Sequence, residues 1–173
     1  EIDINNNSKN KFDIITGCTT FKNINFLNTT IISSDSFCED SLNILNSYGV
    51  INTLKISNSF SDGLDIDFSN LKINKIDIKD SLNDCIDFSY GNYEIAHINV
   101  NKCGDKGLSV GEKSYVNIEK IDVDNSNIGI ASKDSSLIKL KNLNIKKVKN
   151  CLAAYNKKKE FGSATILAHN FEC

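Results

Sequence analysis

An apolar pair recurs every 22 residues through most of this 173-residue chain, and this period constrains the fold more than any other feature. The two members of each pair are separated by one residue, which is mostly polar. The first column of pairs consists of Leu42/Ile44, Leu64/Ile66, Ile86/Phe88, Leu108/Val110, Ile130/Ser132 and Leu152/Ala154. A second column follows twelve to fourteen residues later, and its pairs are Leu54/Ile56, Ile76/Ile78, Ile98/Val100, Ile121/Val123, Leu143/Ile145 and Ile166/Ala168. Single apolar residues form a third column, namely Ile51, Ile73, Ile95, Ile118 and Leu140.

Alternation with a period of two residues predicts short strands that bury one face. Three such strands per period, repeated along the chain, are typical of a parallel β-helix in which each coil pairs with its neighbours. We therefore predict an all-β fold, a right-handed single-stranded parallel β-helix of about seven to eight coils. A leucine-rich repeat has a similar period, but its fixed Leu/Asn consensus is absent from this sequence.

The pattern continues toward the start of the chain with one interruption. Residues that continue it are Phe12/Ile14 in the first column and Ile2/Ile4 and Ile24/Phe26 in the second. From Ile24 to Leu54 the spacing is 30 residues instead of 22, so we predict an insertion near residues 28–37 at one corner of a coil. Such insertions often carry function, and a plain surface loop is the alternative. We expect residues 1–173 to form one domain of a longer or processed protein, because the chain lacks Met and begins beside a strand pair.

Composition excludes several classes of function. The net charge of −2 and the pI of about 5.7 argue against nucleic-acid binding. No apolar run approaches the length of a membrane span. Six cysteines, an even number, are compatible with disulfides in a secreted or cell-surface protein, and buried free thiols are the alternative.

Four successive periods carry turn motifs ahead of the first-column pair. They read SDGLDI (61–66), NDCIDF (83–88), CGDKGLSVGE (103–112) and NIGIASK (127–133). This series resembles the polygalacturonase family of glycoside hydrolases, which are right-handed β-helices of the pectin-lyase-like superfamily. That family carries Asn-Thr-Asp-Gly, Asp-Asp-Cys, Cys-x-Gly-Gly-His-Gly-(Ile/Leu)-Ser-Ile-Gly and Arg-Ile-Lys on consecutive coils, in the same order. The resemblance covers about residues 61–133.

The resemblance implies a set of catalytic positions. Asp62 falls on an aspartate that helps to activate water, and Asp84 on a second carboxylate of the base. Asn83 stands where the family has its proton donor, and an amide has no proton to transfer at useful strength. Because inverting hydrolysis needs a protonated acid on the leaving oxygen, standard polygalacturonase activity is not expected.

The resemblance also implies positions that contact the substrate. Lys106 replaces the family histidine, and Lys133 matches a lysine that helps to bind the substrate carboxylate. Ala131 replaces the partner arginine, so the bidentate clamp for a uronate is lost. The family joins the cysteines that match Cys85 and Cys103, which implies a disulfide between them.

Stacking of the coils independently predicts a cluster of carboxylates. Equivalent positions of neighbouring coils lie ~4.8 Å apart, so Asp62 should lie next to Asp84 and Asp65 next to Asp87. Carboxylates this close bind a cation, pair with lysine or raise one another's pKa. The first outcome is a calcium site at Asp65 and Asp87, and the third is a rearranged acid/base pair with Asp87 as the acid. The predicted catalytic residues are Asp62, Asp84 and Asp87, and the predicted substrate-binding residues are Asp65, Asp67, Lys106, Glu112 and Lys133.

Three interpretations of the function remain open at this point. The first is interaction with a polysaccharide, an acidic or uronate-containing glycan that lies across several coils. This interaction requires no cofactor, although Ca²⁺ is an option. Catalysis is undecided, and the candidate reactions are hydrolysis, lyase and epimerase chemistry. The second is a structural or adhesin-like segment of a larger surface protein, in which Asp62 and Asp84 only cap turns. An intracellular scaffold with reduced cysteines is a third interpretation.

Overall fold

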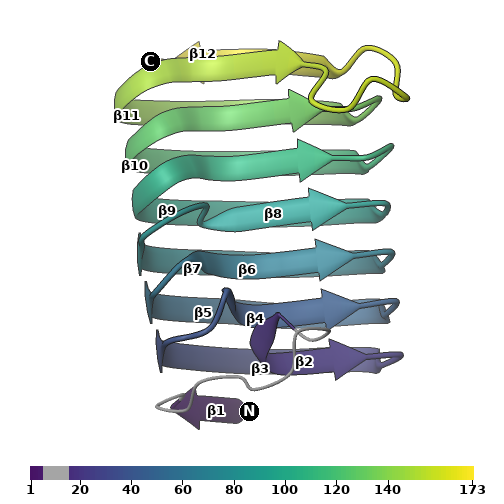
Figure 1. Cartoon of the computed structure of the whole chain (residues 1–173), viewed down its shortest axis with the longest axis vertical. Helices are drawn as coiled ribbons and strands as arrows, with labels where there is room; N and C mark the ends of the chain where they lie inside the picture. The colour runs from purple at the N-terminus through teal and green to yellow at the C-terminus, as the bar shows by residue number, and fades with distance from the viewer. Residues whose placement is uncertain (6–15) are drawn as a thin grey trace.

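The computed structural model describes residues 1–5 and 16–173 and is a parallel β-solenoid of about six coils of ~22 residues (Figure 1). The described strands are β1 (Ile2–Asn5), β2 (Gly17–Lys22), β3 (Asn25–Ser36), β4 (Asp40–Leu45), β5 (Tyr48–Ser59), β6 (Asp62–Asp67), β7 (Asn70–Ser81), β8 (Ile86–Ser89), β9 (Asn92–Gly111), β10 (Tyr115–Lys133), β11 (Leu137–Tyr155) and β12 (Thr165–Glu172). The coil count is lower than predicted, and the pair Phe12/Ile14 lies outside the described residues. Within the described ranges, no helix is long and apolar enough to cross a membrane.

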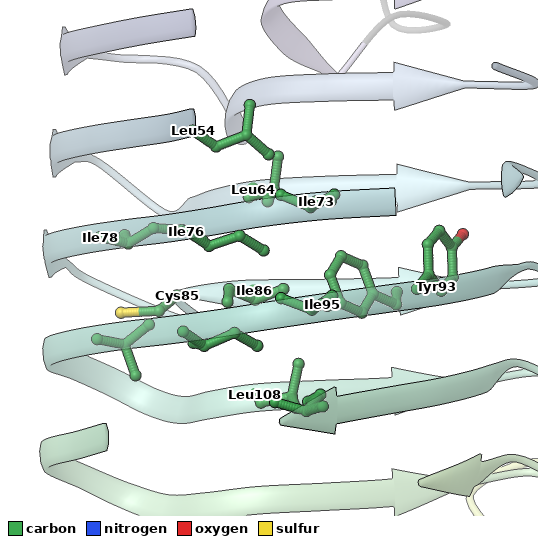
Figure 2. Packing of buried hydrophobic residues seen from close by; sticks show 14 of the residues in the cluster. Leu54, Leu64, Ile73, Ile76, Ile78, Cys85, Ile86, Tyr93, Ile95 and Leu108 are labelled. Atoms are coloured by element: carbon green, nitrogen blue, oxygen red, sulfur yellow. The ribbon is translucent and has the colours of Figure 1, made fainter. Parts of the chain in front are cut away.

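The strand register confirms the 22-residue columns of the sequence. Leu64 pairs with Leu42 on one side and with Ile86 on the other, and this column continues to Leu108 and Ile130. The second and third columns are stacked in the same way from β5 to β11. All of the first-column residues named here are fully buried, and the core side chains point into the space that the coils enclose (Figure 2). The core is therefore one continuous ladder of aliphatic side chains along the axis.

The predicted insertion near residues 28–37 is wrong, because most of these residues belong to β3. This strand pairs with β5, with Ile31 beside Leu54 and Ser33 beside Ile56, and small register shifts around Thr29 leave the pairing on both sides of them unchanged. The second-column pair of this coil is therefore Ile31/Ser33 rather than Ile24/Phe26. A serine occupies a core position there, and its Oγ lies 3.1 Å from Ser41 Oγ in the interior. An apolar pattern misses such a position because the buried hydroxyl is satisfied by another hydroxyl.

The last coil also differs from the prediction. Ile166 pairs with Ile138, Ala168 pairs with the third-column residue Leu140, and Phe171 is the residue that reaches Leu143. Residues 156–164, between β11 and β12, lengthen this period and shift the register.

Three disulfides use all six cysteines, and they join Cys18 to Cys38, Cys85 to Cys103, and Cys151 to Cys173. The predicted Cys85–Cys103 bridge is therefore confirmed. The three bridges indicate an oxidising setting for this protein.

Removing the Cys85–Cys103 bridge should destabilise the fold measurably. The bridge spans 18 residues of sequence, and closing a loop of that size contributes about 3 kcal/mol. Both cysteines are buried, so alanine is the suitable replacement, because serine would place a hydroxyl group in the interior. We expect Cys85→Ala/Cys103→Ala to lower the free energy of unfolding by that amount in urea titrations. An unchanged urea midpoint would show that the bridge adds nothing to stability.

Candidate functional site

The predicted site residues gather on the outer side of β4, β6 and β8 and on the turns at the two ends of these strands. Asp65 pairs with Asp87 in register, and Asp67 pairs with Ser89. Because neighbouring strands in a sheet lie ~4.8 Å apart, these side chains form short rows parallel to the solenoid axis. Lys106, Glu112 and Lys133 come from β9, the turn after it and the end of β10.

The first row lies at the entry to β6 and β8 and joins consecutive turns. Asp62 Oδ1 accepts hydrogen bonds from the backbone N–H of Asp84 at 2.9 Å and from Asn83 Nδ2 at 2.7 Å. Asp84 Oδ1 accepts one from the backbone N–H of Lys106 at 2.9 Å. The two carboxylates therefore do cap turns of the next coil, in agreement with the structural interpretation of these residues.

The lysine at the end of this row is held by carboxylates. Lys106 Nζ lies 3.3 Å from Asp84 Oδ1 and also contacts Asp105. Burial opposes the charged ammonium, but the hydrogen bond and charge of Asp105 and the charge of Asp84 outweigh it and raise the pKa of Lys106 to about 12. Lys106 is therefore protonated at neutral pH, and it cannot serve as the base of a lyase or epimerase.

Burial raises the pKa of both Asp62 and Asp84 above the usual value, although the hydrogen bonds that they accept oppose this effect.

Asp40, a residue that the sequence analysis missed, extends the row by one coil because it pairs with Asp62. It is 3% exposed, and its burial raises its pKa to about 7 against the hydrogen bond from Thr16. The 22-residue spacing from Asp40 to Asp62 was the signal that could have identified it.

The second row runs through the middle of the sheet. Asn43 Nδ2 donates a hydrogen bond of 2.9 Å to Asp65 Oδ2. Burial, together with the charges of Asp67, Asp40 and Asp87, raises the pKa of Asp65 to about 9. Burial also raises the pKa of Asp67, against its hydrogen bond with Asp65. Asp65 is thus a neutral carboxylic acid at pH 7, next to carboxylates that can accept its proton.

Lys133 reaches this row from two coils away. Its Nζ lies 3.5 Å from Asp87 Oδ2, and only 6% of its side chain is exposed. Gly111 lies between them, where a Cβ would come within 3.5 Å of Lys133 Cε. Burial raises the pKa of Asp87 to about 6 although the charge of Lys133 opposes the shift, and Asp87 Oδ1 has no hydrogen-bond partner among the described residues.

Glu112 is held in place by two neighbouring side chains. Its Oε2 accepts a hydrogen bond of 2.6 Å from Ser89 Oγ, and its Oε1 contacts Lys158 Nζ. Burial would raise the pKa of Glu112, but the hydrogen bonds from Lys158 and Ser89 outweigh it and lower the pKa. The segment 156–164 brings Lys158 here, and Asp134 holds it by accepting the backbone N–H groups of Lys157 and Lys158 at 2.7 and 2.8 Å.

Exposed apolar side chains border both ends of these strands. Phe68 follows Asp67 and Tyr90 follows Ser89, and their rings stack with centroids 4.6 Å apart. At the other end, Phe37, Phe60 and Leu82 are 50%, 60% and 71% exposed, and the sequence analysis considered none of them.

One surface hollow, of about 610 Å³, lies away from this site. It is lined by Asn117, Lys139, Leu167 and His169 on the sheet of β10, β11 and β12. In the described part of the chain, no group of three or more His, Cys, Asp or Glu side chains is placed to hold a metal ion.

The site thus combines neutral and charged carboxyl groups, paired lysines and apolar borders on a rigid sheet. Comparison of the chain with protein-family models, with curated proteins and with solved structures finds no match.

Proposed function

We propose that this protein binds a polysaccharide along one side of a right-handed solenoid and acts at a cell surface or as a secreted protein. The surface that we assign to binding, the acidic face, comprises Asp40, Asp62, Asp65, Asp67, Asp84, Asp87, Asp105, Glu112, Lys106, Lys133 and Lys158. The right hand is the one that nearly all parallel crossover connections adopt. The three disulfides support a setting outside the reducing cytosol.

The observation that carries this proposal is the repetition of one chemical group at the coil spacing. Asp40, Asp62 and Asp84 follow one another in consecutive coils, and so do Asp65 and Asp87. A polymer of similar units that lies along the axis can place a hydroxyl donor near each carboxylate, and hydrogen bonds to charged acceptors are the stronger ones. A sheet holds these groups more rigidly than loops would.

The charges of the lysines bear on the kind of glycan. Lys106 pairs with Asp84 and Asp105, and Lys133 pairs with Asp87, so neither ammonium is free to bind a uronate carboxylate. A uronate chain would need a cation to bridge it to the acidic face. Calcium at Asp65 and Asp87 is the bridge that we predict for that case.

A binding assay with matched variants tests this proposal. We expect immobilised protein to retain oligosaccharides, and Asp87→Asn to weaken the affinity about tenfold, which corresponds to the loss of one charged hydrogen bond. Asp77→Asn is the control, because Asp77 is also an outward aspartate with a lysine partner, Lys75, but lies on β7. The screen covers neutral, amine-bearing and uronate-containing oligosaccharides, with and without Ca²⁺. Failure of every glycan to bind would overturn the proposal and leave a structural segment as the function.

Asp65 supports a second candidate, glycoside hydrolysis on the same face. A carboxylic acid that stays protonated at neutral pH can protonate a leaving oxygen, and the ionised carboxylates nearby can activate water. The structure thus favours Asp65 over Asp87 for the role of acid, since the pKa of Asp87 rises only to about 6. Catalysis would be supported if the wild type released product and Asp65→Asn bound the glycan without releasing product. Binding by the wild type without any product would exclude catalysis.

A further inference from the structure

A row of exposed apolar side chains runs beside the acidic face. The backbone N–H of Phe60 donates to Ser36 O, which precedes Phe37, and the N–H of Leu82 donates to Ser59 O, which precedes Phe60. The three side chains therefore occupy one corner of three consecutive coils. We call Phe37, Phe60 and Leu82 the apolar row.

The apolar row adjoins the part of the acidic face in which the carboxyl groups form no ion pair with a described lysine. Phe60 and Leu82 each precede an aspartate of the first row by two residues, Asp62 and Asp84. Lysines pair with Asp84, Asp87, Asp105 and Glu112. Within the described residues, no lysine forms an ion pair with Asp40, Asp62, Asp65 or Asp67.

An unused acceptor lies in this group. Asp40 is 3% exposed, yet its Oδ2 has no hydrogen-bond partner in the described part of the chain. The charges of Asp62 and Asp67 both act on Asp40, so its carboxyl group lies within the cluster. Buried polar atoms are nearly always paired, and a partner that is added on binding is one explanation for an exception.

From these features we propose that the ligand is a chain of amine-bearing pyranoses, such as a glucosamine polymer. Its ring faces would lie against the apolar row, and its ammonium groups would lie among Asp40, Asp62, Asp65 and Asp67. This inference rests on the proposed polysaccharide binding and specifies the class of sugar. Sugar rings carry apolar C–H faces that pack on aromatic and aliphatic side chains, and ammonium groups form charge-assisted hydrogen bonds with carboxylates.

A glycan fits this surface better than a basic peptide does. The same two features, an apolar side chain and an aspartate two residues later, occur in consecutive coils at ~4.8 Å. In a sugar chain with an amine on every unit, each unit carries an apolar ring face and a cation together. A peptide strand instead carries an apolar group and a cation on different residues, and adjacent side chains point to opposite sides of the strand.

Proton release is the signature of this binding mode. Ammonium groups favour the ionised form of neighbouring carboxyl groups, so the pKa of Asp40 and Asp65 should fall when the ligand binds. Calorimetry at one pH, in two buffers of different ionisation enthalpy, measures the protons that are released. A neutral or uronate glycan would release none.

The test uses four probes on the intact disulfide-bonded protein at pH 6.0: glucosamine hexamer, N-acetylglucosamine hexamer, galacturonate hexamer and a lysine–leucine peptide. We expect the glucosamine hexamer to bind at least tenfold more tightly than its acetylated counterpart, with proton release. Phe60→Ala should weaken this binding about tenfold, whereas Phe171→Ala, an exposed aromatic on β12, should not change it. Both side chains are exposed, so folding is retained in each variant, and far-UV circular dichroism verifies this.

The outcomes separate this inference from the proposed function. The amine assignment would be overturned if the acetylated or galacturonate hexamer bound as tightly as the glucosamine hexamer or more tightly. If that binding were lost in Asp87→Asn but not in Phe60→Ala, the acidic face would remain a glycan site. No binding of any hexamer would overturn both proposals. If the lysine–leucine peptide alone binds, the surface serves a protein partner and both glycan proposals fail.

Discussion

Substitution of Asp65 by asparagine should raise the free energy of unfolding by several kcal/mol at pH 8, because each unit by which the pH exceeds the unfolded-state pKa costs the wild type about 1.4 kcal/mol. Burial raises the pKa of this carboxyl group from 3.8 to about 9 in the folded protein. Between these two values the folded state keeps a proton that the unfolded state releases, so stability falls as the pH rises through this window. Asparagine is neutral in both states, and it removes this loss.

The pH dependence distinguishes this effect from a change in packing. Well below the unfolded-state pKa of 3.8 the aspartate is protonated in both states, so wild type and Asp65→Asn should there unfold at the same urea concentration within error. The difference should then grow up to about pH 9. Asp77→Asn serves as the control and should show no such growth. A constant difference at all pH values, or none at pH 8, would mean that Asp65 is ionised at little cost in the folded protein.

Replacement of Phe88 by alanine should lower the free energy of unfolding by about 3–5 kcal/mol, the usual cost of removing a buried phenylalanine. Phe88 is fully buried, and its ring stacks on Tyr93 with centroids 4.5 Å apart. The hydroxyl oxygen of Tyr93 lies 3.0 Å from the carbonyl oxygens of both Ile66 and Ser89. These polar contacts restrict how far the tyrosine can move to fill the space that Phe88 leaves.

Urea unfolding followed by circular dichroism measures this loss. Phe88→Leu keeps most of the volume and should cost less than half as much. Phe171→Ala is the exposed control and should change the stability by less than about 1 kcal/mol. A loss below 1 kcal/mol for Phe88→Ala would show that neighbouring coils collapse into the space and that this part of the core is not tightly packed.

The sequence predicted the central coils closely and the two ends less well. From Leu42 to Leu152 every first-column residue is stacked where the 22-residue period puts it, because the core residues of each coil pack on those of the neighbouring coils. The prediction failed at Ser33 and in the last coil. In the first case a serine pairs with another hydroxyl in the core, and in the second a longer connection shifts the register.

Within the site, the neighbours along a row were predictable and the partners across rows were not. Asp62 beside Asp84, and Asp84 beside Lys106, follow from equal spacing alone. Lys158 reaches Glu112 only because residues 156–164 cross to another coil, and no period encodes that path.

The sequence by itself thus determined the solenoid and the rows of residues on it, since both depend on a repeat that can be counted along the chain. Only the tertiary structure decided the chemical state of the rows. Whether a carboxyl group is charged depends on how deeply neighbouring coils bury it and on which ammonium reaches it. Asp65 and Asp87 occupy equivalent positions, yet Lys133 contacts Asp87 and none of the described lysines pairs with Asp65, so their pKa values differ.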